Sequence, residues 1–85
     1  MNTKATPTQK HWEEIAQTQL QGRTITKVRY MSVKLAEEQF GWCERGLILT
    51  LDDGNQLIVS ADDEGNGPGS LFTLDPVHNI LPVIR

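Results

Sequence analysis

The sequence has little cysteine, few aromatic residues and no long apolar run, and each shortage excludes a class of protein. A single cysteine, Cys43, cannot form an internal disulfide, whereas small domains of oxidising compartments usually carry several. The most apolar stretches, Leu47 to Leu51 and Leu57 to Val59, are far shorter than the roughly 20 residues that span a bilayer. The N-terminus has no apolar segment typical of a secretory signal. We therefore expect a cytoplasmic protein.

What the chain does contain fits one small globular domain. Apolar residues make up 38% and charged residues 22% of 85 residues, which is neither a disordered nor a membrane composition. A chain of this size supports one thin core and no second one. We therefore expect a single domain over residues 1–85, with residues 1–6 disordered.

Charge is divided unevenly along the chain. Residues 1–34 carry six basic and two acidic residues, and residues 35–85 carry two basic and nine acidic ones. Ordinary surface charge is the plainer explanation. The alternatives are that the basic and acidic halves attract each other within the fold, between two copies, or that one half attracts an outside partner. Lys27 and Arg29 share one face of a predicted strand and Tyr30 lies on the other. An aromatic ring that could stack on a base is therefore not placed beside the positive charges that would contact the phosphates. With the acidic net charge, this argues against nucleic acid.

A helix is predicted from Pro7 to Gln21. Thr6 is a suitable cap, Pro7 suits the first helical position, and Gln9 completes a capping box. Gly22 then supplies a left-handed residue after the last turn. The helix has one apolar face, formed by residues at helical spacing: Trp12, Ile15, Ala16 and Leu20.

Strands are predicted after the helix. Arg23 to Leu35 is rich in β-branched residues. Its apolar residues change from one face of the strand to the other partway along, which indicates a bend or bulge. Residues 36–39 are expected to form a loop or one helical turn. Short strands are expected at Leu71–Leu74 and Ile80–Ile84, the latter confined to an edge by Pro82.

The segments Leu47–Leu51 and Gln56–Ala61 flank a turn and predict a β-hairpin. A three-residue turn, Asp52 to Gly54 with Gly54 left-handed, gathers the leucines on one face and pairs Ile48 with Ile58 on the other. We therefore predict an α+β fold, an N-terminal helix packed on a mostly antiparallel sheet of four or five strands. An open sheet and a small barrel both remain compatible.

The second face of the hairpin suggests an interaction surface. One helix covers one face of a sheet, so the C-terminal segment or a second copy must cover the other. We therefore expect a non-catalytic protein-interaction module that self-associates or binds another protein, without membrane or nucleic-acid partners. The tryptophans and phenylalanines, Trp12, Phe40, Trp42 and Phe72, are most simply core, and an exposed one would mark an interface. The interface candidates are Ile48, Ile58, Trp42 and Phe72.

The alternative function is ligand or cation binding by the acid–glycine loop, residues 62–70. Asp62, Glu64 and Asn66 match the first ligand positions of a Ca²⁺ loop, and Asp75 is a further oxygen donor. The match fails at the twelfth position, which is Thr73. A turn that needs glycine backbone angles explains the loop more simply. Phosphate binding is disfavoured because three acidic residues precede the glycines.

Catalytic patterns are weak. A nucleophile such as Cys43 needs a histidine beside it, and nothing in the sequence brings His11 or His78 there. Acidic doublets point apart on a strand and make no acid–base pair by themselves. We therefore expect no enzyme activity.

Three segments carry a resemblance: residues 22–25 (GRTI), 49–54 (LTLDDG) and 62–69 (DDEGNGPG). Together they resemble short bacterial proteins that are grouped only as a domain of unknown function. The resemblance covers most of the chain from Leu20 onward. It implies a bacterial, cytoplasmic protein and brings no activity or catalytic residues with it.

Overall fold

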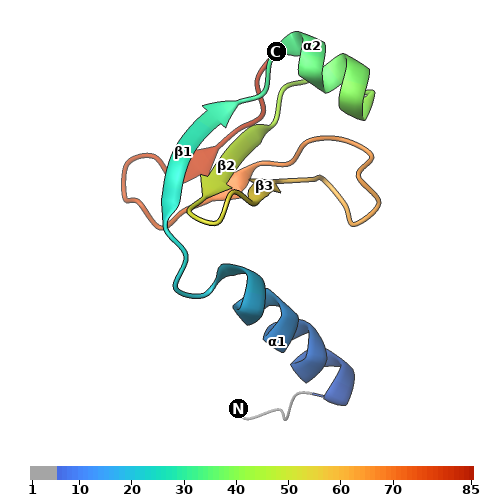
Figure 1. The fold of residues 1–85 in the computed structure, drawn as a ribbon. Helices are drawn as coiled ribbons and strands as arrows, with labels where there is room; N and C mark the ends of the chain where they lie inside the picture. The colour runs from blue at the N-terminus through green and yellow to red at the C-terminus, as the bar shows by residue number, and fades with distance from the viewer. Residues whose placement is uncertain (1–5) are drawn as a thin grey trace.

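The structure, a computed structural model, describes residues 6–85, so the disorder expected for residues 1–6 lies outside them except at Thr6, which caps α1. Its elements follow one another along the chain as shown in Figure 1. They are α1 (Pro7–Leu20), β1 (Ile25–Tyr30), α2 (Val33–Leu35), the π-helix η1 (Ala36–Phe40), β2 (Leu47–Leu51), β3 (Gln56–Ile58), β4 (Leu71–Phe72) and β5 (Ile80–Leu81). The predicted α+β class is confirmed.

The start and end of α1 follow from local hydrogen bonds. The Thr6 hydroxyl accepts from the Gln9 amide at 3.1 Å, and the Gln9 side chain accepts from the Thr6 amide at 2.7 Å. This capping box satisfies two amides that a helix start leaves free. Gly22 follows the helix with a φ of 76°, which is open to glycine at little cost. The predicted helix is therefore confirmed to within one residue.

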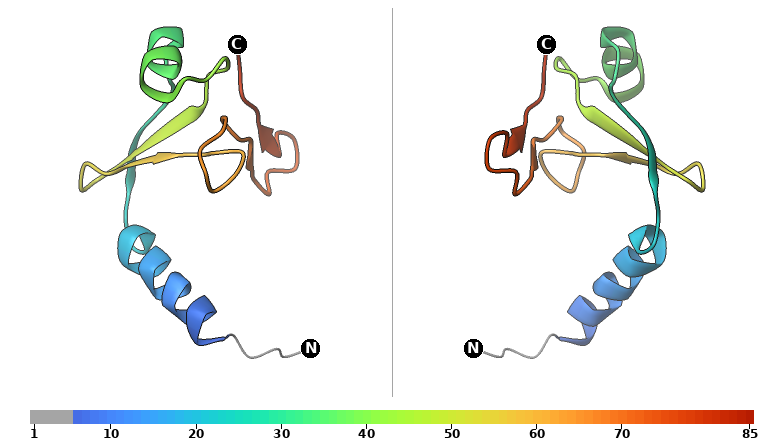
Figure 2. Two further views of the ribbon diagram at one scale, coloured as in Figure 1. Left: turned by 90° about the vertical axis from the view of Figure 1, so that its right-hand side faces the viewer. Right: turned by 90° about the vertical axis from the view of Figure 1, so that its left-hand side faces the viewer.

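The position of α1 differs from the prediction. Within the described residues α1 contacts no other helix or strand, and none of its residues is buried. Figures 1 and 2 show it projecting from the lower end of β1, away from both sheets. The expected packing of this helix on the sheet is therefore absent, because the segment after Leu20 directs the helix outward.

The main sheet is antiparallel, with the strand order β1-β2-β3. Ile48 pairs with Ile58, Leu49 with Leu57, and Thr50 with Gln56. The predicted register and three-residue turn are therefore confirmed, and Gly54 has the expected positive φ, 88°. A register shift lies between Ile25 and Lys27, near the start of β1. The bend expected further along the Arg23–Leu35 segment is not part of the strand, because β1 ends at Tyr30 and α2 begins at Val33.

The C-terminal strands form a sheet of their own. β4 and β5 pair antiparallel, so the strands are divided between two open sheets and no barrel closes. The segment after β5 is tied to the main body. The Tyr30 hydroxyl donates to the Pro82 carbonyl at 2.7 Å, and Arg45 and Ile84 exchange backbone hydrogen bonds.

The core lies around β2. Ile48 packs with residues that precede β2, and Leu35 and Ile58 border this cluster of Met31, Ala36, Trp42 and Ile48. Leu47 and Leu51 are buried on the other face of the same strand. Both faces of β2 are thus covered within the chain. The sequence led us to expect the C-terminal segment or a second copy over the Ile48 face, whereas Met31, Ala36 and Trp42 cover it.

Candidate functional site

The sequence-based interface candidates divide into two groups. Ile48 is 1% exposed and Trp42 is also buried, so neither side chain is accessible to a partner. Their assignment to an interface is corrected, because residues 31–42 fold over the Ile48 face. Ile58 is half-buried against the same cluster. Phe72 is 74% exposed and remains a candidate.

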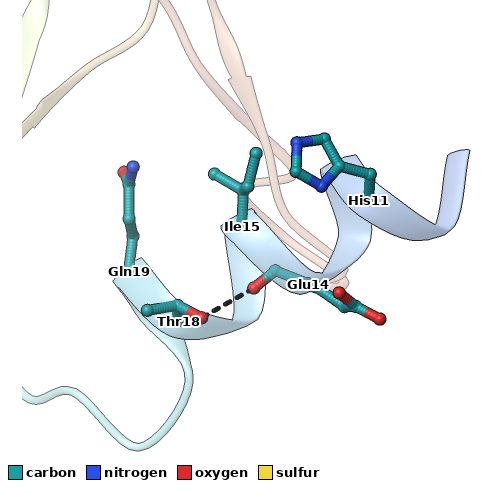
Figure 3. A pocket seen from close by; sticks show the side chains of 5 residues that line it. All are labelled: His11, Glu14, Ile15, Thr18 and Gln19. Atoms are coloured by element: carbon teal, nitrogen blue, oxygen red, sulfur yellow. Dashed lines mark hydrogen bonds between the residues drawn. The ribbon is translucent and has the colours of Figure 1, made fainter. Parts of the chain in front are cut away.

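The apolar face of α1 is exposed to solvent. Trp12 is 64% exposed, although its size and type suit a core position, and Leu20 is exposed as well. The face was recognised in the sequence by its helical spacing, but its exposure was not. The described residues that line a shallow depression beside it all belong to α1 (Figure 3). His11, Ile15 and Gln19 project together along this side of the helix.

A second apolar surface lies on the β4–β5 hairpin. Phe72 and Ile80 are cross-strand partners, so their side chains share one face. The loop between them carries Leu74, which is fully exposed, and Val77, which is 75% exposed. We call these four residues, Phe72, Leu74, Val77 and Ile80, the hairpin knob. Sequence reasoning named only Phe72; the close spacing of the other three was the available signal.

The loop of the hairpin knob is held by Asp75. One carboxylate oxygen of Asp75 accepts from the amides of Val77 at 3.0 Å and His78 at 2.6 Å. These two hydrogen bonds hold the pKa of Asp75 below its usual range, and the bond from the His78 amide has the larger effect. Thr73 adds a hydroxyl bond to the His78 carbonyl at 3.0 Å. The apolar side chains are therefore displayed on a preorganised turn.

The proposed cation ligands are used within the acid–glycine loop. Oδ1 of Asp62 accepts from the Glu64 amide at 2.9 Å and the Asn66 amide at 3.2 Å, and Oδ2 accepts from the Asn66 side chain at 2.9 Å. The side-chain bond from Asn66 is the main reason that the pKa of Asp62 is lowered. Asp75 serves the hairpin loop instead. Among residues 6–85, no three His, Cys, Asp or Glu side chains form a metal-binding group.

The acid–glycine loop is also tied to the core. The Trp42 indole donates to the Gly65 carbonyl at 2.9 Å, and the Ser60 hydroxyl donates to the Gly67 carbonyl at 3.2 Å. A Cβ on Gly69 would lie 2.7 Å from the Ser60 carbonyl oxygen, closer than real contacts allow. The glycines here permit a tight backbone path beside Trp42.

The segment between α1 and β1 is fixed by several contacts. The Arg23 amide donates to the Leu20 carbonyl at 3.1 Å, and the Asp52 amide donates to the Thr24 carbonyl at 2.9 Å. The Arg23 guanidinium lies 3.8 Å from an Asp52 oxygen and 3.5 Å from an Asp53 oxygen. These groups are partly exposed, so each ion pair is weak by itself. Together with the backbone bonds they orient the start of β1.

The groups considered for catalysis lie on separate parts of the chain. Cys43 is a free, exposed thiol after η1, and His11 lies on α1, which contacts no other element in the described chain. The His78 amide, on the hairpin loop, bonds to Asp75. None of the helices described by the structure is long and apolar enough to cross a membrane.

Comparisons with known proteins give no relative for this chain: no protein-family profile, curated protein or solved structure matches it.

Proposed function

We propose that this chain is a non-catalytic protein-interaction module that self-associates. The observation that carries the proposal is the exposed apolar face of α1, where Trp12 is 64% exposed on a helix that contacts no other helix or strand among residues 6–85. An isolated helix of 14 residues is only marginally stable in water, because most helical stability in proteins comes from packing of an apolar face. A partner surface supplies that packing.

The rest of the exposed surface supports the same function. Large exposed apolar groups on a small domain mark interaction sites more often than chance. Trp is also enriched among the residues that dominate binding energy. A cytoplasmic setting is part of the proposal, because the only cysteine, Cys43, is exposed and free.

Sedimentation velocity across a wide range of concentration tests self-association. The native chain is expected to form a dimer as concentration rises. Trp12→Glu places a charge on the apolar face and should raise the dimer dissociation constant about tenfold or more. Gln17→Glu, which adds the same charge on the opposite side of α1, should behave like the native chain. Circular dichroism shows whether each variant keeps its fold.

A native chain that stays monomeric at every concentration would contradict the proposal. Equal weakening by Trp12→Glu and Gln17→Glu would also contradict it, because charge alone would then explain the effect.

A further inference from the structure

Resting on the proposed function, we infer that α1 of one copy docks on the hairpin knob of a second copy. The second copy returns the same contact, so two chains exchange helices about a twofold axis. The two surfaces are the α1 apolar face (Trp12, Ile15, Ala16 and Leu20) and the hairpin knob.

The area of these surfaces matches that of a stable dimer. At their exposed fractions, Trp12, Leu20 and the knob residues present roughly 800 Å² per copy, since a large aromatic side chain alone contributes roughly 150–250 Å². Two copies that exchange helices bury each surface once. With all of this area covered, the total is at most roughly 1,600 Å², which is the size of a standard specific interface. Either surface paired only with itself would bury considerably less.

The helix does not reach the hairpin knob of its own chain. The backbone bonds at Leu20 and Thr24 and the ion pairs of Arg23 with Asp52 and Asp53 fix the segment that follows α1. That segment points the helix away from the C-terminal hairpin, and α1 and β4–β5 make no contact with each other. Figure 2 shows the two elements well separated in both views. A second copy therefore supplies the knob.

The chemistry of the two surfaces is compatible. Every residue that defines the two surfaces is apolar, so their contact desolvates no charge that belongs to either surface. The carboxylate next to the knob residues, that of Asp75, is already satisfied by the Val77 and His78 amides. Because this loop is preorganised, docking costs little ordering of the backbone.

Disulfide cross-linking between two chains that carry cysteine at different positions tests the exchange of helices. In a Cys43→Ser background, one chain carries Gln19→Cys, two helical turns from Trp12 on the same face, and the other carries Val77→Cys. Mild oxidation of the mixture should give a disulfide between the two chains, and each chain alone should give far less. As a control, Gln17→Cys on the opposite side of α1 should cross-link poorly to Val77→Cys.

The outcomes separate this inference from the proposed function. A dimer in which Gln19→Cys links mainly to Gln19→Cys, or in which Gln17→Cys links to Val77→Cys equally well, overturns the exchange and leaves self-association standing. A monomer by sedimentation overturns both. Preferential linkage of Gln19→Cys to Val77→Cys supports both.

Discussion

The indole Nε1 of Trp42 donates a hydrogen bond to the carbonyl oxygen of Gly65 at 2.9 Å, across 23 residues of sequence. This contact joins the acid–glycine loop to a core residue and explains why the loop has one defined path. The loop therefore acts as a cover for Trp42, and its polar side chains shape the turn.

Trp42→Phe tests this relationship. Phenylalanine keeps an apolar ring in the core but lacks the N–H donor, so it loses ring volume and leaves the Gly65 carbonyl without its partner. We expect a loss of about 1–3 kcal/mol in the free energy of unfolding, measured in urea. Trp12→Phe, on the exposed face of α1, is the matched control and should change monomer stability little. Equal effects of the two substitutions would contradict the structural role of Trp42.

Gly69→Ala should destabilise the fold through close backbone contact. The new Cβ would lie 2.7 Å from the Ser60 carbonyl oxygen, and backbone atoms cannot yield as a side chain does. Overpacking of this kind costs about 1–3 kcal/mol. Gly67→Ala is the control, because its Cβ would meet nothing within 4 Å, and it should be neutral or slightly stabilising. Thermal unfolding of both variants measures the difference, and a tolerated Gly69→Ala would be the contrary result.

Stability should fall in acid partly through Asp62. Its pKa is lowered in the folded chain, above all by the Asn66 side chain, from the ordinary value of 3.8. The unfolded chain therefore binds the proton more readily, and stability rises with pH in this range. The contribution is complete above pH 3.8 and is lost as the pH falls through the lower, folded value.

Asp62→Asn removes this titration and should flatten the acid decline of the urea midpoint relative to the native chain. Asp63→Asn changes a neighbour whose carboxylate forms no hydrogen bond among residues 6–85, and it is the reference variant. If Asp62→Asn and Asp63→Asn gave the same pH profile, the hydrogen bonds to Asp62 would not stabilise its charged form.

Asp75→Ala should weaken dimerisation without removing any apolar contact. The Val77 and His78 amides lose their acceptor, so the hairpin knob loses its preorganised turn and must be ordered on binding. We expect the dimer dissociation constant to rise several-fold by sedimentation. Ser70→Ala, an exposed change just before β4, should leave it unchanged. If Asp75→Ala dimerised as tightly as the native chain, an ordered loop would not be needed for docking.

The sequence predicted the local structure well where short-range signals act alone. Thr6 and Gln9 marked the start of α1, and the leucine alternation with Gly54 determined the hairpin register. Each of these predictions depends on residues a few positions apart, whose relative geometry is determined locally. The expected turn character of the acid–glycine loop also agrees with the bonds that Asp62 accepts.

The sequence could not predict which aromatic residues are buried. Trp12 and Trp42 have the same size and hydrophobicity, and a helical face of this kind usually packs on its own sheet. Their difference depends on long-range placement: Trp42 follows the turn at Gly41 and joins the cluster around Ile48, whereas α1 contacts no other helix or strand among residues 6–85. Both strands of the hairpin knob were expected, but their separation from the main sheet was not, and it is this separation that leaves the knob exposed.

The central claim is that the exposed apolar face of α1 packs on a second copy of the chain. Hydrogen exchange of the α1 amides at low and high protein concentration tests it most directly. Docked on a partner, α1 is held by packing, and its amides between Lys10 and Leu20 should exchange much more slowly at high concentration. The amides of β2 should be protected equally at both concentrations. Exchange of α1 at the rate of a fraying helix at every concentration would contradict the proposal.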